Sequence, residues 1–261
     1  MIYFAQCAFS SLGLLLDFKM RILGLTGNIA CGKSTLAALL KARGATILDA
    51  DKLVHELYAD AHFSQQIAEL FQGHEVLNAT GTVDRARLST LAFQDSDAMR
   101  RLEALVHPAV AALRDEKLRA LESLETAPAV VVLEAVKLIE SAQAERCEEV
   151  WCVVCSPENQ LQRMIQTRGL SQAQAQARLD AQPTMSQKKS LLAALEIPFV
   201  CIENDGTLED LKQNVDRLWQ KFLEQEIPCK GNASDSHSPD QVPQNDAPQN
   251  VISAINHFSA V

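Results

Sequence analysis

The sequence predicts an α/β fold, in which a five-stranded parallel sheet is flanked by helices and carries two helical insertions. Short apolar runs alternate with helical segments along most of the chain, which is typical of parallel strands joined by helices. A glycine-containing loop stands between the first apolar run and a strong helix-forming segment. Two long helical segments interrupt the alternation, and we interpret them as insertions.

The expected elements follow in chain order. Apolar runs predict strands, and the last one is followed by an amphipathic helix at 207–223; the strands are 21–26, 45–49, 129–134, 149–154 and 198–202. The first insertion, about 51–125, contains a long helical stretch at 98–124, which we expect to be broken by His107-Pro108. The second, about 157–195, contains a helix at 171–179 with few large apolar residues. Such a helix suits either a closing lid or a plain surface helix.

The two ends of the chain differ in composition from its interior. Residues 1–19 are mildly apolar, lack the basic segment of a signal peptide, and end directly before Met20. We interpret them as a dispensable extension, with Met20 as an alternative start. Residues 228–250 are rich in Asn, Asp, Ser, Gln and Pro, which predicts a disordered tail over 228–261. The folded domain is therefore expected at 20–227.

Composition excludes several classes of function. The 261 residues carry a net charge of −9 without a basic patch, which argues against a nucleic-acid partner. No apolar run is long enough for a membrane span. The seven cysteines are scattered and odd in number, which indicates a reducing cytoplasm rather than a disulfide framework. Cys152 and Cys155 have the spacing of a zinc motif, but a second pair is missing, so we interpret them as apolar residues of a buried strand.

The strongest functional signal is the loop that follows the first strand. Residues 27–35 match the phosphate-binding pattern G-x-x-x-x-G-K-[ST] at every fixed position, between a strand and a helix. In this context the backbone N–H groups and the helix N-terminus bind phosphate, so we expect a fold of the P-loop NTPase type that binds ATP. Lys33 would reach the β- and γ-phosphates, and Ser34 would bind Mg²⁺. The remaining nucleotide-binding residues expected here are Gly27, Asn28, Ala30, Cys31, Gly32 and Thr35.

Two carboxylates, Asp49 and Asp51, follow the second strand. Its carboxyl end should lie on the same edge of the sheet as the phosphate loop. A carboxylate there can accept the proton of an attacking hydroxyl or hold Mg²⁺ through water. Either residue could instead cap the next helix. For Asp49 both interpretations stay open, and for Asp51 we favour the functional one.

Taken together, these motifs resemble the dephospho-coenzyme A kinase family. The phosphate loop with its strand, 23–35, and the D-A-D segment, 48–51, match the family pattern. Further family motifs have counterparts in the same order, at 81–88 (GTVDRARL), 105–108 (LVHP), 155–163 (CSPENQLQR), 178–182 (RLDAQ) and 202–206 (IENDG). The resemblance covers about residues 20–223. It implies a P-loop kinase with a helical substrate domain and a lid, which transfers the ATP γ-phosphoryl group to the ribose 3′-hydroxyl of dephospho-coenzyme A.

Three segments depart from the family pattern. The family has D-[IV]-P-L-L-[FY]-E after the third strand, whereas 134–140 reads EAVKLIE, with the proline lost and Lys137 gained. The lid arginine expected four residues after Arg163 is replaced by Thr167, with Arg168 beside it. The segment 188–196 matches K-x-x-x-A-D only with an uncertain register.

The resemblance also implies roles for single residues. Asp51 matches the catalytic carboxylate, while Lys33 and Arg163, with Arg168 in place of the shifted arginine, would hold the transferring phosphoryl group. Because a misplaced acceptor would let water attack, closure of the lid would also suppress ATP hydrolysis.

Four further residues are assigned by position in the motifs. Arg85 could bind the substrate pyrophosphate or form a structural ion pair. His107 could face the substrate or be a satisfied histidine at a helix break. Asn204 and Gly206 follow the last strand, where related kinases receive adenine, although a simple turn explains them slightly better. Another small-molecule kinase of this fold, a nucleotide-dependent switch and an inactive relative remain alternatives.

Overall fold

The computed structural model describes residues 20–141 and 143–225, so the predicted extension at 1–19 and tail at 228–261 lie outside the described residues. Five strands form one sheet in the order β2-β3-β1-β4-β5, with every neighbouring pair parallel. They are β1 (Arg21–Gly27), β2 (Thr46–Asp49), β3 (Val130–Glu134), β4 (Glu149–Val154) and β5 (Phe199–Glu203). The predicted five-stranded parallel sheet is therefore confirmed, with each strand within one residue of its expected bounds.

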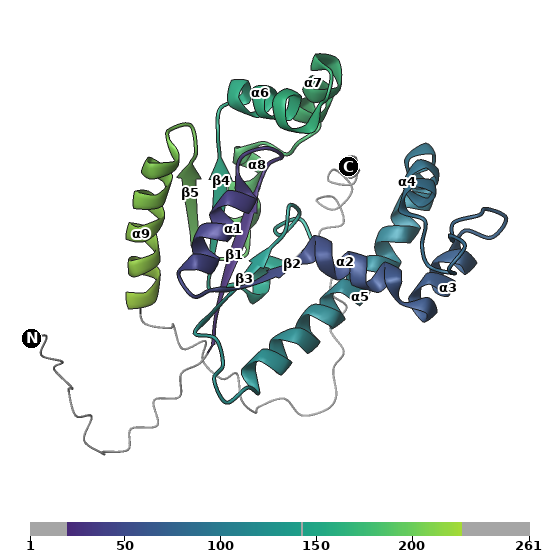
Figure 1. Cartoon of the computed structure of the whole chain (residues 1–261), viewed down its shortest axis with the longest axis horizontal. Helices are drawn as coiled ribbons and strands as arrows, with labels where there is room; N and C mark the ends of the chain where they lie inside the picture. Colours follow the sequence, from purple (N-terminus) through teal and green to yellow (C-terminus); the bar gives the residue numbers. More distant parts are fainter. Residues whose placement is uncertain (1–19, 142, 226–261) are drawn as a thin grey trace, which may run out of the picture.

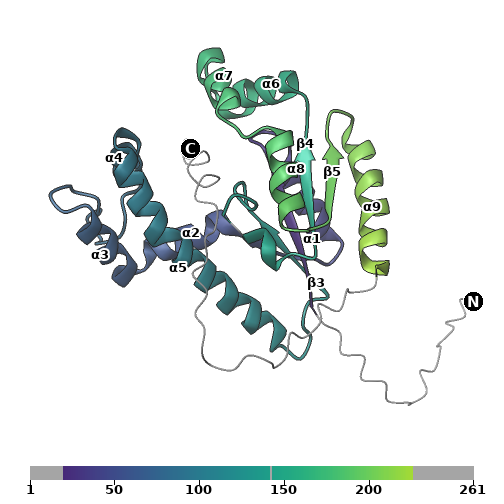
Figure 2. The same ribbon diagram turned by 180° about the vertical axis from the view of Figure 1, so that it is seen from behind.

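Helices join the strands and cover both faces of the sheet (Figures 1 and 2). They are α1 (Lys33–Ala42), α2 (Ala50–Ala59), α3 (Ala61–Leu70), α4 (Arg85–Gln94), α5 (Ser96–Glu122), the short 3₁₀ helix η1 (Gln143–Arg146), α6 (Pro157–Arg168), α7 (Gln172–Asp180), α8 (Met185–Ala194) and α9 (Leu208–Glu224). None of the helices in the described ranges is long and apolar enough to cross a membrane.

Side-chain alternation along the strands divides the core into two layers. On one face, Trp151 and Val153 pack with α1 and α9, whose side chains Leu36, Leu40 and Val215 are fully buried. On the other face, Val150 packs with the end of α5, with η1 and with α8. Because successive strand residues point to opposite faces, this alternation fixes the register of each strand.

The insertion between β2 and β3 consists of α2 to α5 and has its own apolar core (Figure 1). This core contains Phe63, Ile67, Leu88 and Leu102. The sequence led to two expectations about the insertions, namely their bounds and a break in the long helix of the first. The bounds of the substrate domain and of the lid stay predictions, whereas the expected break at His107-Pro108 is wrong.

Helix α5 runs without interruption from Ser96 to Glu122, with Pro108 inside it. A proline in a helix interior removes one backbone hydrogen bond and costs about 3 kcal/mol. Burial on both sides of the proline offsets this cost, because Leu102 and Val106 precede it and Val110 and Leu118 follow it on the same buried face. Tertiary packing therefore overrides the local preference of the sequence.

The order of the strands places β1 at the centre of the sheet, between β3 and β4. The chain leaves β1 for the outer strand β2, returns to β3 on one side of β1, and then crosses to β4 on the other side. Ligands of open α/β sheets bind at such a switch point, beyond the carboxyl ends of the strands. The segments that follow β1, β2, β3 and β5 meet there.

Candidate active site

The phosphate loop connects β1 to α1 at this switch point. Gly27 ends β1 so close to β4 that a Cβ atom would lie 2.7 Å from the carbonyl oxygen of Val153. Gly32 caps α1 with a left-handed φ of 98°, and Ala30 also has a positive φ of 60°. Helix α1 begins at Lys33, so its N-terminal N–H groups face the loop and provide the expected site for phosphate.

Lys33 forms an ion pair with Glu134, the last residue of β3, at 2.7 Å between Nζ and Oε1. Only 13% of the Lys33 side chain and 8% of the Glu134 side chain are exposed. Glu134 is the first residue of the family segment 134–140, for which the sequence predicts no role of this residue. A signal was present, because Glu134 is the one charged residue of the strand Val130–Glu134, which lies beside β1.

Two residues from distant segments hold the phosphate loop from the side of β5. The guanidinium of Arg163 donates to the carbonyl oxygens of Ala30 and Cys31, each at 3.4 Å, and of Asn204 at 2.7 Å. The Asn204 side-chain amide donates to the Cys31 carbonyl at 2.7 Å. A Cβ atom on Gly32 would lie 2.1 Å from that amide nitrogen, so the contact requires glycine. Asn204 therefore fixes the loop as well as following β5.

The tip of the loop contacts the region between β4 and β5, which includes the expected lid. The Ile29 N–H donates to Gln182 Oε1 at 2.6 Å, and Gln160 Nε2 donates to the Ile29 carbonyl at 2.8 Å. Asn28 Nδ2 donates to the Pro183 carbonyl at 3.4 Å. Neither glutamine is among the site residues that the sequence predicts. Gln182 ends a quoted family motif, which was the available signal.

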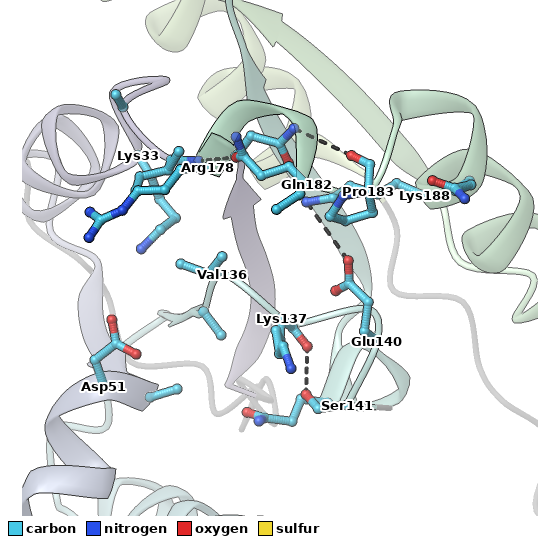
Figure 3. Close-up of a pocket in the computed structure, with 18 of the residues that line it drawn as sticks. Lys33, Asp51, Val136, Lys137, Glu140, Ser141, Arg178, Gln182, Pro183 and Lys188 are labelled. Carbon is cyan, nitrogen blue, oxygen red and sulfur yellow. Dashed lines mark hydrogen bonds and ion pairs between the residues drawn. The ribbon is translucent and has the colours of Figure 1, made fainter. Parts of the chain in front are cut away.

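The two aspartates after β2 have different roles in the structure. Asp49 is the N-cap of α2, and its Oδ1 accepts from the N–H groups of Asp51 and Lys52. The structure thus favours the capping interpretation for Asp49. Asp51 lies in the first turn of α2, is exposed, and faces the main cavity (Figure 3).

This cavity has a volume of about 1650 Å³ and extends from the phosphate loop to the helical insertion (Figure 3). It exceeds the roughly 300–1,000 Å³ of common small-molecule sites, which suits two substrates bound side by side. Residues expected to bind phosphate or metal lie along it, as do polar side chains from α6, from α7, from α8 and from the segment between α7 and α8. They include Asn28, Ala30, Gly32, Lys33, Ser34, Thr35, Arg163, Thr167, Arg168, Arg178, Gln182 and Lys188.

The other predicted site residues are distributed unevenly. His107 on α5 and Arg168 at the end of α6 line the cavity. Burial lowers the pKa of His107 below its ordinary value, which favours the neutral ring at pH 7. Arg85 does not line the cavity and contacts His55 Nε2 instead. Gly206 belongs to the turn before α9, where a Cβ atom would lie 2.9 Å from an oxygen of Asp210.

The thiols near the loop form part of the packing. Cys152 is fully buried in β4, and Cys155 follows the end of that strand beside Cys31. A hydrogen bond from Cys155 lowers the pKa of Cys31, and the same bond raises the pKa of Cys155. Across 20–141 and 143–225, no group of three or more His, Cys, Asp or Glu side chains is arranged to hold a metal ion.

Known proteins share both the sequence pattern and this arrangement. The family model for dephospho-CoA kinase matches residues 21–210. A dephospho-CoA kinase of Geobacter metallireducens is 38% identical over 78% of this chain and 98% of its own length. A dephospho-CoA kinase of Cutibacterium acnes is 38% identical over 76% of this chain and 83% of its own.

Two solved structures are also similar. The protein TT1252 from Thermus thermophilus is 32% identical, with a TM-score of 0.63 over 77% of this chain and 97% of its own. A dephospho-CoA kinase from Campylobacter jejuni is 27% identical, with a TM-score of 0.56 over 77% of this chain and 96% of its own. The matches extend over both the phosphate-loop core and the helical insertion that forms the second wall of the cavity. This chain is accordingly a kinase of the P-loop fold and belongs to the dephospho-CoA kinase family.

Proposed function

We propose that this protein transfers the γ-phosphoryl group of ATP to the ribose 3′-hydroxyl of dephospho-CoA, which yields CoA and ADP, the last step of CoA biosynthesis. The observation that carries the proposal is one cavity that joins a complete phosphate loop to the carboxylate of Asp51 and to a helical insertion. Phosphoryl transfer depends mainly on positioning and charge stabilisation, and this cavity supplies groups for both.

The phosphate loop binds ATP through its backbone N–H groups, from Gly27 to Thr35. Lys33 is held by Glu134 in this structure. Because nucleotide phosphates compete for its ammonium group, binding ATP would release Lys33 from Glu134 and turn it toward the β- and γ-phosphates. Asn204 and Gly206 remain the proposed neighbours of the adenine, and Asn204 already contacts the loop.

Ser34 and Glu134 fit a magnesium site, because both offer oxygen ligands. Mg²⁺ is commonly held by few protein oxygens together with substrate phosphates, so two residues suffice. When bound, the ion would neutralise charge on the phosphate oxygens. Glu134 can bind the ion only after Lys33 has left it for the nucleotide phosphates, so the Lys33–Glu134 ion pair would open when ATP and Mg²⁺ bind.

Asp51 is the proposed general base. Its place in the first turn of α2 leaves the carboxylate exposed to the cavity, on the side of the helical insertion. From there it would accept the proton of the 3′-hydroxyl as the oxygen attacks. The neighbouring Asp49 is occupied by capping and does not compete for this role.

The lid arginines act on the transferring group from the opposite wall. Arg163 contacts loop carbonyls here, so we propose that it keeps the loop in shape and lies within reach of the phosphates. Arg168 is exposed at the end of α6 and would approach as the lid closes. Arg85 and His107 stay proposed substrate contacts, with His107 already at the cavity.

We propose that the protein acts in the cytoplasm. The five cysteines within the described ranges are all free thiols, as expected for a chain kept in a reducing compartment.

The test is ADP release from Mg-ATP with dephospho-CoA, AMP, adenosine or no acceptor. We expect strong stimulation by dephospho-CoA alone. Asp51→Asn should lower kcat about 10²–10⁴-fold, the usual contribution of a positioned base, with little change in the KM for ATP. Asp49→Asn is the matched control two residues away, because asparagine caps a helix as well as aspartate.

The outcomes separate the parts of the proposal. Stimulation by AMP or adenosine rather than dephospho-CoA would assign the chain another acceptor. Equal loss of activity in Asp49→Asn and Asp51→Asn would contradict the role of Asp51 as the base.

A further inference from the structure

The wall of the cavity opposite the lid carries little positive charge. We call it the acceptor wall and define it as the residues of α2, α5 and the segment 135–143 that line the cavity. Three of its side chains are carboxylates, from Asp51, Glu103 and Glu140. Among its described residues, Lys137 is the only lysine or arginine. Burial lowers the pKa of His107, which favours its uncharged ring.

Lys137 is held in place by its backbone. The Lys137 carbonyl accepts from the Ser141 N–H at 2.9 Å and from the Ser141 hydroxyl at 2.6 Å. The preceding carbonyl, of Val136, accepts from Thr26 Oγ1 at 3.0 Å, which ties the segment to β1. The base of the Lys137 side chain is therefore fixed at the cavity (Figure 3).

The ammonium group of Lys137 reaches α5, where its Nζ lies 3.2 Å from Glu103 Oε1. The side chains of Lys137 and Glu103 are 31% and 18% exposed, so this pair borders the cavity rather than being enclosed. Exposed and partly exposed ion pairs contribute little stability, so a ligand anion can exchange with the carboxylate at low cost.

The acceptor of the proposed function carries such an anion, because a diphosphate joins its adenosine to its pantetheine arm. Glu140 is already paired with Lys188 of α8, at 3.9 Å between Nζ and Oε1, and both side chains are buried. A diphosphate beside Asp51 and Glu103 needs a compensating cation on the same wall. Arg85, the cation that the sequence indicated, lies outside the cavity. We propose that Lys137 is a specificity-determining residue that binds the diphosphate of the acceptor, exchanging Glu103 for a phosphate oxygen as the acceptor enters. This inference rests on the proposed function and adds the residue that selects an acceptor with a diphosphate.

The experiment compares steady-state kinetics of the full chain and four variants, with ATP saturating and dephospho-CoA varied. Lys137→Met keeps the length and removes the charge, and should raise the KM for dephospho-CoA about tenfold, as expected for one charge-assisted hydrogen bond. The kcat and the KM for ATP should stay within twofold, since Lys137 lies away from the reacting atoms. Lys137→Arg should restore most of the affinity. A general disturbance of the site by Lys137→Met would instead raise the KM for ATP and the KM for dephospho-CoA together.

Lys117→Met is the matched control. Lys117 Nζ pairs with Glu56 at 2.7 Å, its side chain is 35% exposed, and it lies outside the cavity. The Lys117→Met variant removes a comparable ion pair of α5 and should leave kcat and both KM values unchanged.

Glu103→Gln gives an independent test in a chain that keeps its lysine. It should lower the KM for dephospho-CoA or leave it unchanged, because Lys137 no longer has to leave a carboxylate.

Three results would overturn the inference: an unchanged KM for dephospho-CoA in Lys137→Met, an equal rise of the KM for ATP and for dephospho-CoA in that variant, or a raised KM for dephospho-CoA in Glu103→Gln. The same assay measures the turnover of dephospho-CoA by the wild-type protein. No turnover of dephospho-CoA there would refute the proposed function itself.

Discussion

Two glycines with nearly the same backbone conformation allow a direct test of how the phosphate loop is built. Gly32 has a φ of 98°, and Gly44, between α1 and β2, has a φ of 94°. A Cβ atom on Gly32 would lie 2.1 Å from Asn204 Nδ2, whereas a Cβ atom on Gly44 meets nothing within 4 Å. Gly32→Ala therefore adds a steric conflict to a backbone strain that Gly44→Ala has alone.

The magnitudes follow from these contacts. An L-residue in the left-handed region costs roughly 1–2 kcal/mol, which is the full effect expected for Gly44→Ala. In Gly32→Ala the amide at the end of the Asn204 side chain must also move away from the new Cβ atom. The hydrogen bond from Asn204 to the Cys31 carbonyl is lost as well, worth about 1 kcal/mol. We expect Gly32→Ala to lower the free energy of unfolding by about 1 kcal/mol more than Gly44→Ala does.

The assay is urea unfolding of both variants, followed by the KM for ATP. Gly32→Ala should raise this KM at least about tenfold, because the displaced loop no longer aims its N–H groups at the phosphates. Gly44→Ala should leave it unchanged. Equal free energies of unfolding and equal KM values in the two variants would refute the idea that the Gly32–Asn204 contact shapes the loop.

Two further predictions concern charged groups. Glu134→Gln should lower kcat about 10²-fold, because one preorganised charge is lost beside Lys33. The same variant should raise the Mg²⁺ concentration that gives half the maximal rate. An unchanged Mg²⁺ concentration at half-maximal rate would exclude Glu134 from the metal site. Asp205 accepts hydrogen bonds from Asn159 and Ser156, which hold its pKa below the ordinary value. Its contribution to stability is therefore present above pH ~4 and is lost as the pH falls through the lower folded value. Asp205→Ala should be less stable at pH 7 and should lose less stability between pH 4 and pH 2 than the wild type; parallel pH profiles of unfolding would contradict this.

The strands could be predicted from sequence because each is a local pattern. The apolar runs at 130–134 and 149–154 are buried whichever strand lies beside them, so their positions follow from composition alone. The path of α5 could not be predicted in this way. Whether Pro108 ends a helix depends on apolar contacts that its neighbours make with other parts of the chain.

The phosphate loop was predictable for a similar reason, since its chemistry is encoded in nine consecutive residues. The residues that support it were not. Glu134 is 101 positions from Lys33, and Asn204 is 173 positions from Cys31. The assignment of Arg85 shows the reverse case, because a motif named the residue while the structure turns it toward His55.

The sequence by itself determined the α/β class, the order of the strands along the chain and the phosphate-binding loop, because each depends on residues close together in the chain. Only the tertiary structure decided which carboxylate pairs with Lys33, which side chains hold the loop and which cations line the cavity. These contacts depend on the parallel register of β1, β3 and β4 and on the packing of α5 against the sheet. Such long-range geometry is set by the fold as a whole, and no local pattern encodes it.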